Sequence, residues 1–455
     1  MAKNKTVYAC AACGAISPKW QGQCADCGQW NTLSEQVEVK APVRSGRFAG
    51  FAGAASTVTR LPEVQTGNIQ RWPTGSGELD RVLGGGLVPG SVVLIGGDPG
   101  IGKSTLLTQT LCLLAGQGPA LYVTGEESLE QVSLRAKRLG LGESNLALLA
   151  ETQVERIVAV AEQEKPQVMV VDSVQTLYTE QLQSAPGGVS QVRESAALLT
   201  RFAKQTGTAL FLVGHVTKDG ALAGPRVLEH MVDAVLYFEG ESDGRFRLVR
   251  AVKNRFGAVN ELGVFAMTET GLKEVKNPSA IFLTRNSQPV PGSLVTATWE
   301  GTRPLLVEVQ ALVDESRAGH PRRVAVGLDS NRLAMLLAVL HRHGGVQSYD
   351  QDVFLNVVGG VRVLETSADL AQLLAVVSSL RNRPLPTDLI AFAEVGLAGE
   401  LRPVPNGQER LKEAAKHGFR RAIVPLGNAP KQPPEGMTVQ AVRSLHEALQ
   451  AAYQE

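Results

Sequence analysis

The chain has 455 residues, of which 44% are hydrophobic, so it is long enough for about two or three domains with ordinary packed cores. Its formal net charge is +1, so any contact with DNA must come from local basic patches rather than from the overall charge. No segment approaches the roughly 18 unbroken apolar residues of a membrane span, and the first residues lack the apolar region of a secretion signal. We therefore expect a soluble cytoplasmic protein that makes no membrane contact.

The first domain is expected at residues 1–45, where four of the five cysteines cluster. They form two Cys-x-x-Cys pairs, Cys10 with Cys13 and Cys24 with Cys27. Two such pairs can present four thiolates tetrahedrally to one Zn²⁺, and a redox pair or chance spacing is the alternative. Because so short a segment cannot bury much core, the metal would supply its folding energy. We predict a zinc-finger module followed by a linker.

Residues 97–104, Gly-Asp-Pro-Gly-Ile-Gly-Lys-Ser, match the phosphate-binding loop G-x-x-x-x-G-K-[ST]. The apolar run before them is typical of a buried strand, and residues 105–114 are typical of a helix. In this setting backbone N–H groups face phosphate oxygens, Lys103 reaches the β- and γ-phosphates, and Ser104 ligates Mg²⁺. A glycine-rich turn before a helix is the alternative. The predicted nucleotide contacts are Gly97, Asp98, Pro99, Gly100, Ile101, Gly102, Lys103, Ser104 and Thr105.

Strands and helices alternate through the second domain, which is expected at residues 46–285. This alternation implies an α/β fold with a mostly parallel sheet and helices on both faces. Besides the strand before the phosphate-binding loop, strands are predicted at residues 120–124, 167–172, 208–213, 234–238 and 246–250.

Polar residues that could act on ATP follow several of these strands. Asp172 ends one strand and is placed as a Mg²⁺ ligand would be, although an Asp after an apolar run is common. Glu126 and Glu127 end another, and we favour Glu126 as the general base that activates water, with Glu127 second. The alternative for this pair is capping of the next helix together with Ser128. His215 is either a sensor of the γ-phosphate or an ordinary surface histidine.

A doubly basic element, Lys-Asn-Arg-Phe-Gly, occupies residues 253–257 after the last predicted strand. Positive groups supplied in trans can stabilise the charge that develops on a γ-phosphate. In a ring, Lys253 and Arg255 would enter the site of the neighbouring subunit. A basic strand end on a solvated face is the alternative.

These elements together resemble the bacterial RadA (Sms) family. The resemblance covers essentially the whole chain, and the element at residues 253–257 is specific to that family. It implies a RecA-like ATPase core and a DNA-dependent ATPase or ring helicase that uses ATP/ADP, Mg²⁺ and Zn²⁺. It also implies a role in homologous recombination and DNA repair, as a homo-hexameric ring that binds single-stranded and branched DNA and promotes branch migration with RecA. Besides the cysteine pairs, the motifs that carry it are residues 97–104, 122–128, 170–173 and 253–257.

Two loops, at about residues 181–193 and 218–226, match positions where such cores contact DNA. Arg193, Lys218 and Arg226 supply positive charge for DNA phosphates there. Ordinary surface charge is the alternative for all three.

The third domain, expected at residues 286–455, resembles the proteolytic domain of Lon through residues 356–360 and 391–396. Ser367 falls near the position of the Lon nucleophile, but Arg410 stands where the Lys base should be. An Arg guanidinium stays protonated and cannot take the proton of a serine. We therefore expect an inactive α+β domain that helps to build the ring and offers a DNA-binding surface. Candidates for that surface are Arg303, Arg317, Arg322, Arg323 and Arg381.

Two other functions remain in competition. An ATP-dependent protease of the Lon type would need Ser367 as its nucleophile, and Arg410 argues against it. A non-hydrolysing scaffold or signalling protein of related fold, such as the clock-type ATPases, is the third possibility. The zinc module and the Lon-like domain count against that one.

Overall fold

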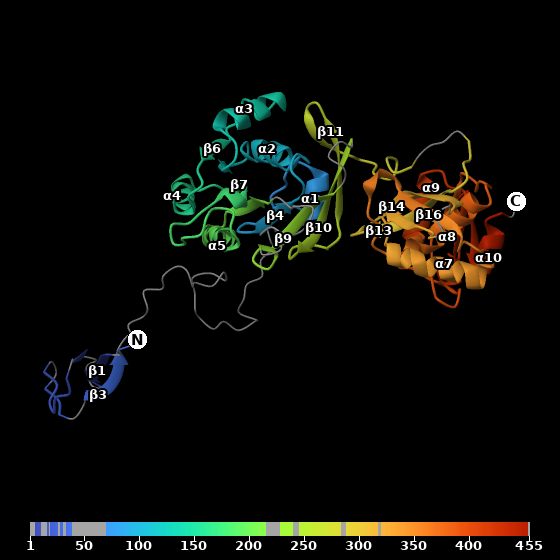
Figure 1. Cartoon of the computed structure of the whole chain (residues 1–455). Helices are drawn as coiled ribbons and strands as arrows, with labels where there is room; N and C mark the ends of the chain where they lie inside the picture. Colours follow the sequence, from blue (N-terminus) through green and yellow to red (C-terminus); the bar gives the residue numbers. More distant parts are fainter. Residues whose placement is uncertain are drawn as a thin grey trace. The chain divides into compact units, whose positions relative to one another are not determined.

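The computed structural model describes residues 5–10, 16–17, 19–25, 28–30, 33–38, 70–214, 228–239, 245–283, 288–316 and 320–453. The chain divides into two units, Met1–Ala55 and Ser56–Glu455, and each is described by itself (Figure 1). The first unit holds a three-stranded antiparallel sheet in the order β2-β1-β3. Its strands are β1 (Lys5–Cys10), β2 (Ile16–Ser17) and β3 (Leu33–Glu38).

The N-terminal part of the second unit is built on a nine-stranded sheet with the order β12-β11-β10-β9-β4-β8-β7-β5-β6. Six adjacent strands, from β9 to β6, are parallel, and the other three continue the sheet as an antiparallel meander. The large parallel sheet predicted from the sequence is therefore confirmed. The strands are β4 (Val92–Gly96), β5 (Ala120–Thr124), β6 (Ala147–Ala150), β7 (Val168–Asp172), β8 (Ala209–Val213), β9 (Ala234–Glu239), β10 (Phe246–Asn254), β11 (Leu262–Thr268) and β12 (Gly271–Glu274).

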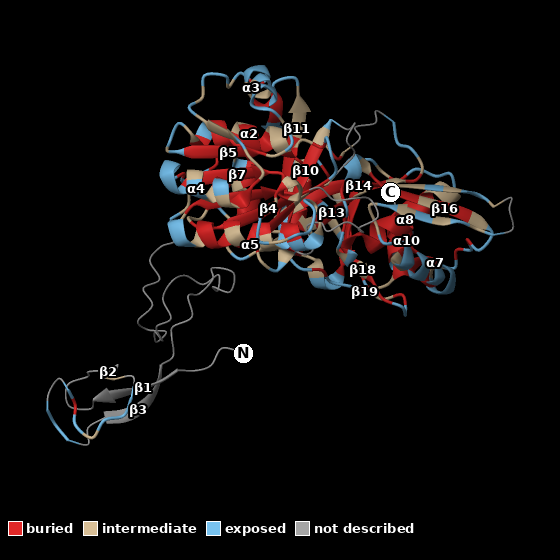
Figure 2. Cartoon of the chain, turned by 60° about the vertical axis from the view of Figure 1, so that its left-hand side comes forward, coloured by how far each residue is buried: buried red, intermediate tan, exposed pale blue. Residues whose placement is uncertain are grey.

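Helices bury both faces of this sheet, which explains why its central strands are apolar throughout. Successive strand residues point to opposite faces; Val93 packs in the core cluster with α2, whereas Val92 packs in the cluster with α4 and α5. Every residue of β4 and β8 is buried, and β4 is labelled on the red central part of Figure 2. The helices are α1 (Gly77–Leu83), α2 (Lys103–Leu114), α3 (Leu129–Arg138), α4 (Val154–Glu164), α5 (Val189–Thr206) and the 3₁₀ turn η3 (Val174–Thr176).

The C-terminal part of the second unit contains a seven-stranded mixed sheet with the order β15-β16-β14-β13-β17-β20-β21. The sheet combines an antiparallel meander, β13-β14-β16, with parallel pairings of β17, β20 and β21. The strands of this part are β13 (Ser293–Glu300), β14 (Arg303–Glu315), β15 (Arg323–Val326), β16 (Gln351–Val357), β17 (Leu389–Ala391), β20 (Arg421–Pro425) and β21 (Thr438–Val442), with the separate pair β18 (Glu394–Val395) and β19 (Leu401–Arg402).

Helices cover both faces of this second sheet as well. One core cluster joins α7, α8 and α10 to residues such as Leu389, whereas Ile390 points the other way into a cluster with α9. Helix α8 is buried along ten of its residues, seven of which are apolar. The helices are α7 (Ser330–Gly344), α8 (Asp369–Leu380), α9 (Gly407–Lys416) and α10 (Leu445–Ala451), with 3₁₀ turns η4 (Val358–Gly360), η5 (Thr366–Ala368) and η6 (Leu426–Asn428).

Buried ion pairs connect the C-terminal part of the second unit to its N-terminal part. Arg250 of β10 is 3% exposed and contacts the carboxylates of Glu239 on β9 and Glu300 on β13. Arg303 of β14 binds Glu78 of α1 with two hydrogen bonds of 2.9 and 2.7 Å. Removing one partner of a buried pair costs about 3–5 kcal/mol, because the other charge is left uncompensated. The predicted boundary at residues 285–286 lies inside this unit, at positions outside the described ranges, and stays a prediction.

Across the described ranges, none of the helices has the length and apolar character that a membrane crossing requires.

Candidate nucleotide-binding site

The phosphate-binding loop connects the central strand β4 to helix α2, as the sequence predicts. Gly100 and Gly102 have φ angles of +77° and +117°, a region that side chains with a Cβ rarely adopt. Gly102 is also the N-cap of α2, and no side chain caps the helix there. The first N–H groups of α2 are thus left for an anion, and the helix dipole favours negative charge at this end.

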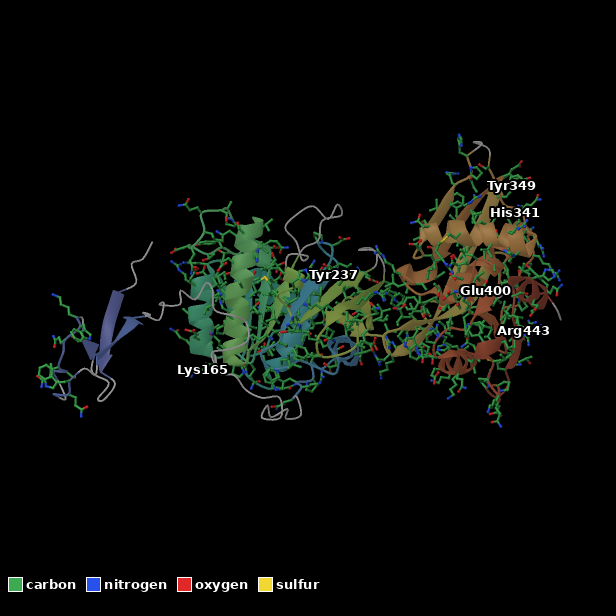
Figure 3. The ribbon with its side chains drawn as sticks, turned by 90° about the horizontal axis from the view of Figure 1, so that it is seen from below. Lys165, Tyr237, His341, Tyr349, Glu400 and Arg443 are labelled. Carbon is green, nitrogen blue, oxygen red and sulfur yellow. The ribbon has the colours of Figure 1, made fainter. Side chains whose placement is uncertain are left out.

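Tyr237 of β9 limits the space beside the loop. Its ring packs against Gly96 so closely that a Cβ on that glycine would lie 2.5 Å from a ring carbon. The side chain, labelled in Figure 3, donates from its hydroxyl to Glu229 at 3.3 Å. The neighbouring strand therefore requires a glycine at the end of β4.

Lys103 is 3% exposed at the start of α2, and its ammonium is bound by the loop itself. Nζ donates to the carbonyl oxygens of Gly97 at 2.7 Å and Asp98 at 2.9 Å. Burial lowers the pKa of Lys103, and the negative charges of Asp172, Asp98 and Glu126 oppose that effect. Both partners are neutral carbonyls, so phosphate oxygens can replace them with a gain in charge pairing.

Asp172, the predicted Mg²⁺ ligand, ends β7 and is 7% exposed. The hydroxyl of Tyr122, on the adjacent strand β5, donates to its Oδ2 at 2.6 Å. Burial raises the pKa of Tyr122 well above its ordinary value, and the charge of Asp172 adds to the effect. Tyr122 therefore stays a hydrogen-bond donor that fixes one carboxylate oxygen of Asp172. Ser104, its predicted partner, lies half-buried in the first turn of α2.

The two glutamates after β5 have different surroundings. Glu127 is paired with Arg135 of α3, whereas Glu126 is exposed and accepts a 2.5 Å hydrogen bond from Ser173 Oγ. Capping of α3 is done by Ser128, whose hydroxyl and backbone N–H bond with Gln131. The carboxylate of Glu127 is occupied by its ion pair with Arg135, so this arrangement favours Glu126 over Glu127 for activating water.

Lys253 and Arg255 lie at the opposite end of the sheet from the phosphate-binding loop. Arg255 N–H donates to the carbonyl of Asp233, just before β9, and Asp233 N–H donates to Val92 at the start of β4. The loop follows Gly96 at the other end of β4, about 13 Å away at roughly 3.3 Å per residue. The geometry thus keeps these two cations away from the nucleotide site of their own subunit.

Their side chains are held by the subunit to which they belong. Lys253 Nζ donates to the carbonyl of Val232 at 2.8 Å, and burial followed by the charge of Arg255 lowers the pKa of Lys253. Arg255 pairs with Asp233 at 3.1 Å, yet 54% of its side chain is exposed. Arg255 can therefore be reached by another molecule.

Comparisons with known proteins identify the family. A family model described as an AAA domain matches residues 58–221, and one described as a rubredoxin metal binding domain matches residues 8–35. Proteins named DNA repair protein RadA are similar over the whole length: that of Pseudomonas aeruginosa is 71% identical, with 100% of both chains covered. Those of Escherichia coli (98% of both chains) and Bacillus subtilis (99% of both) are 62% and 49% identical. This chain belongs to the RadA family. It is an α/β enzyme with an AAA-type ATPase domain and an N-terminal zinc ribbon.

The zinc ribbon of this RadA-family chain is described only in part. Cys24 is 4% exposed, and its carbonyl accepts the N–H of Gly28, whose φ is +69°. This tight turn puts a buried sulfur at the start of the Cys24-x-x-Cys27 pair, as a metal knuckle requires. Cys13, Cys27 and the Cys10 side chain lie outside what the structure describes, so the four-thiolate site stays a prediction. His215, Lys218 and Arg226 are outside the described ranges as well.

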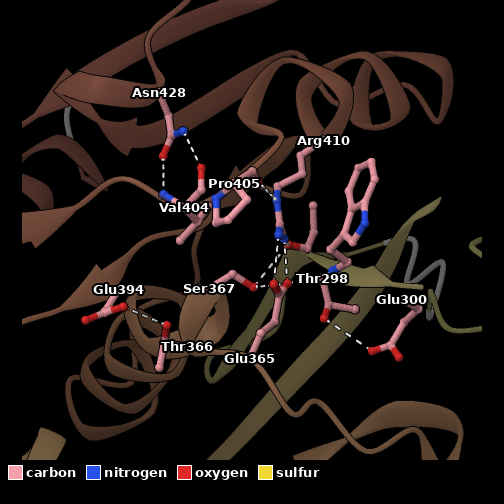
Figure 4. A network of polar contacts seen from close by, with 12 residues as sticks. Thr298, Glu300, Glu365, Thr366, Ser367, Glu394, Val404, Pro405, Arg410 and Asn428 are labelled. Atoms are coloured by element: carbon pink, nitrogen blue, oxygen red, sulfur yellow. Dashed lines mark hydrogen bonds and ion pairs between the residues drawn. The ribbon is translucent and has the colours of Figure 1, made fainter. Parts of the chain in front are cut away.

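The C-terminal domain brings Ser367 and Arg410 together through a residue that the sequence did not indicate. Glu365 accepts hydrogen bonds from Arg410 Nη1 and Nη2, at 2.6 and 2.8 Å, and from Ser367 Oγ at 2.6 Å (Figure 4). Arg410 has 0% exposure and also donates to the backbone carbonyls of Pro405 and Ala297. The serine thus donates to a carboxylate that is already neutralised by an arginine.

Some of the arginines proposed for a DNA-binding surface have other partners. Arg303 binds Glu78 and the carbonyl of Leu262, and Arg322 binds Asp352. Arg317 lies outside the described ranges, whereas Arg381 is exposed after α8. The expectation of a free phosphate-binding cation is therefore wrong for Arg303, which serves the contact between the two parts of the unit.

Proposed function

We propose that this member of the RadA family is a DNA-dependent ATPase that forms a hexameric ring on single-stranded DNA. The ring would use ATP hydrolysis to promote branch migration of recombination intermediates together with RecA. The observation that carries this proposal is the separation of Lys253 and Arg255 from their own phosphate-binding loop, since it leaves a neighbouring subunit as the place where they can act.

Within the nucleotide site, each side chain has a role that its contacts support. Lys103 would exchange its two carbonyl partners for β- and γ-phosphate oxygens. Ser104 and Asp172 would hold Mg²⁺, which neutralises charge on the transferred phosphoryl group. Glu126 would orient and deprotonate the attacking water.

The neighbouring subunit would complete the site. Lys253 and Arg255 would approach the γ-phosphate across the subunit boundary, where positive charge stabilises the transition state. Because hydrolysis would then change the contact between subunits, it would shift the DNA-binding loops between two positions. A subunit outside the ring would bind ATP but turn it over slowly.

DNA would pass residues 181–193 and 218–226; the first of these segments was expected to be a loop throughout, but residues 189–193 form the start of α5. Arg193 is exposed near the start of α5, which supports a contact with DNA phosphates, and Lys218 and Arg226 are proposed for the same role. His215 is proposed as the residue that links the γ-phosphate to these loops. The zinc ribbon, with Cys10, Cys13, Cys24 and Cys27 as ligands, would bind DNA or a partner protein, and we expect the protein to work in the cytoplasm.

An Arg255→Ala variant tests the shared site. We expect it to bind a fluorescent ATP analogue normally and to hydrolyse ATP at least about 100-fold more slowly in the presence of single-stranded DNA. Arg420→Ala, which removes an exposed arginine from the C-terminal domain, is the matched control and should keep the normal rate. Full turnover by the Arg255→Ala ring would contradict action in trans, and a wild-type rate that does not respond to DNA would contradict the DNA-dependent motor.

Proteolysis of the Lon type gains no support from the residues around Ser367. Its hydroxyl donates to Glu365, and Arg410 saturates that carboxylate from a fully buried position. A base that is paired with a guanidinium cannot readily take the serine proton. We therefore propose a structural role for this domain.

A further inference from the structure

Lys253 lies in the last part of β10, directly after a β-bulge, and Arg255 lies in the short loop that follows the strand. In the pairing of β9 with β10, Ala251 is opposite Leu236 and Lys253 is opposite Val235, so Val252 is an extra residue. A bulge bends its strand and redirects the side chains that follow. The direction of both cations therefore depends on how the loop is held after the bulge.

Asn254 ties this loop to helix α1. Its Nδ2 donates to the carbonyl of Val82 at 3.1 Å, and its Oδ1 accepts the N–H of Phe256 at 2.8 Å. One side chain thus joins the loop to another element and closes the loop on itself. An amide supplies the donor and the acceptor that these two bonds need, whereas an aspartate would lack the donor.

The loop also packs against Gly84, the C-cap of α1, and the contact leaves no room for a side chain. A Cβ on Gly257 would come within 2.6 Å of the Cα of Gly84, and a Cβ on Gly84 would come within 2.8 Å of the Cα of Gly257. The guanidinium of Arg71 donates to the carbonyl of Phe256 at 2.8 Å, which gives the loop a further contact with its own subunit. The backbone after Arg255 is therefore held by direct contact.

Helix α1 is itself fixed at both ends. Its apolar residues Leu79 and Val82 are fully buried in the core of the ATPase sheet. Glu78, 7% exposed, accepts two hydrogen bonds from Arg303 and one from the N–H of Val264. A seven-residue helix held in this way gives the loop a rigid reference on its own subunit.

We infer that α1 and Gly84 form a bracket that sets the positions of Lys253 and Arg255 for catalysis in the neighbouring subunit, with Asn254 as the positioning residue. This inference rests on the function proposed above. It gives a role to two of the uncharged residues of the element, since the contacts of Asn254 and Gly257 fix the backbone on both sides of Arg255 and directly after Lys253. A displacement of about 1 Å in a catalytic group can cost on the order of 100-fold in rate.

Two substitutions test the bracket, one by removing a hydrogen bond and the other by adding a side-chain atom. Asn254→Asp keeps an acceptor for Phe256 and removes the donor to Val82, and Gly257→Ala adds an atom where Gly84 leaves no space. We expect both to lower kcat for ATP at least about tenfold in rings on single-stranded DNA, with KM for ATP changed less than about twofold. The matched control, Asn331→Ala on the exposed side of α7, should leave both constants unchanged.

Rings that contain two kinds of subunit can show whether a bracket variant is slow because its cations are misplaced or because the whole subunit is damaged. A Lys103→Ala subunit has a defective phosphate-binding loop but an intact bracket, and Asn254→Asp or Gly257→Ala subunits have the reverse. In rings assembled from equal amounts of Lys103→Ala and either bracket variant, about one interface in four joins an intact loop to intact cations. We expect ATP hydrolysis to reappear in these mixtures, although each variant alone is nearly inactive.

The mixture of Lys103→Ala with Arg255→Ala serves as the reference. If this reference shows no recovery, action in trans is wrong and the proposed function fails with it. If the reference recovers and a bracket variant does not, or if the bracket variants alone keep the normal kcat, the bracket is wrong and the proposed function stands. Recovery in both mixtures supports the bracket.

Discussion

A buried cation stands near carboxylates and a serine in both parts of the second unit, but the two cations are bonded in opposite ways. Lys103 is close to three negative groups, and yet its hydrogen bonds go to the neutral carbonyls of the phosphate-binding loop. Arg410 is saturated by Glu365 and by two backbone carbonyls.

This difference separates a cation that can act from one that holds the fold. Replacing the carbonyl partners of Lys103 with phosphate oxygens exchanges a neutral acceptor for a charged one, which favours binding. Replacing Glu365 as the partner of Arg410 would break a bidentate ion pair inside the protein, which is costly. Burial and charge are alike at the two sites, so the replaceability of the partners is what distinguishes them.

Lys103→Ala gives the largest effect expected from this comparison. Loss of the ammonium should reduce ATP hydrolysis at least about 1,000-fold while leaving the thermal unfolding midpoint nearly unchanged, because only two bonds to loop carbonyls are lost. A coupled ATPase assay and calorimetry would measure the two quantities. Lys137→Ala, at an exposed position of α3, is the control and should behave as wild type. A variant with normal turnover would show that the nucleotide binds elsewhere.

Arg410→Met should give the reverse result. The change leaves the Glu365 carboxylate without its partner, and we expect the free energy of unfolding to fall by about 3–5 kcal/mol. Urea unfolding would measure this loss. Arg402→Met, at a 57% exposed arginine of the same domain that pairs with Glu400, should cost no more than about 1 kcal/mol. If both variants lost the same free energy of unfolding, buried Arg410 would contribute no more to stability than exposed Arg402.

Tyr122→Phe tests a third contact, the hydrogen bond from Tyr122 to Asp172 in the nucleotide-binding site. It removes a hydrogen bond to the Asp172 carboxylate without changing the size of the ring, and a bond to a charged group is worth about 1.5–3 kcal/mol. We expect ATP turnover to fall about tenfold and the Mg²⁺ concentration for half-maximal rate to rise. A titration of the rate against Mg²⁺ would measure both. An unchanged Mg²⁺ requirement would mean that Tyr122 supports the sheet rather than the metal site.

The smallest expected effect concerns the acid dependence of the Glu365 pair. Burial acts to raise the pKa of Glu365, but the bonds and charge of Arg410, with the Ser367 hydroxyl, hold that pKa below its ordinary value. The stability that the ionised pair contributes is therefore complete above the pKa of an unfolded glutamate and is lost as the pH falls through the lower, folded value. Urea unfolding of wild type and Glu365→Gln at decreasing pH should show a constant difference down to about pH 5, and a shrinking one in more acidic buffer. A difference that shrinks already between pH 8 and pH 6 would contradict the low pKa.

The sequence predicted the features that short-range rules determine. The phosphate-binding loop needs only local spacing, and the apolar runs before it and around Asp172 gave the central strands within a residue or two. The expectation that Ser367 is inactive rests on Arg410, which cannot act as a base whatever surrounds it, and it stays a prediction.

What the sequence missed depends on contacts across strands. The bond from Tyr122 to Asp172 follows from the pairing of β5 with β7, and no spacing along the chain indicates it. Glu365 belongs to no motif, and its role appears only when Ser367 and Arg410 are brought to it. Arg303 was misjudged because its partner, Glu78, lies 225 positions away. Capping with Ser128 was weighed as a role for the two glutamates, but the local Ser128-x-x-Gln131 spacing already indicates Gln131 as the partner of the cap.

The pairing of Arg250 with Glu300 affects how the chain can be divided for experiments. A shortened protein that ends after residue 283 would keep Arg250 in the sheet and lose both Glu300 and the apolar side chains that cover Leu248 and Val264. Such a fragment would expose an apolar surface around an unpaired guanidinium and would tend to aggregate. Low activity of the fragment would then reflect aggregation and not a catalytic role of the C-terminal domain. Point substitutions in the full-length chain are the sounder way to ask what the C-terminal domain does.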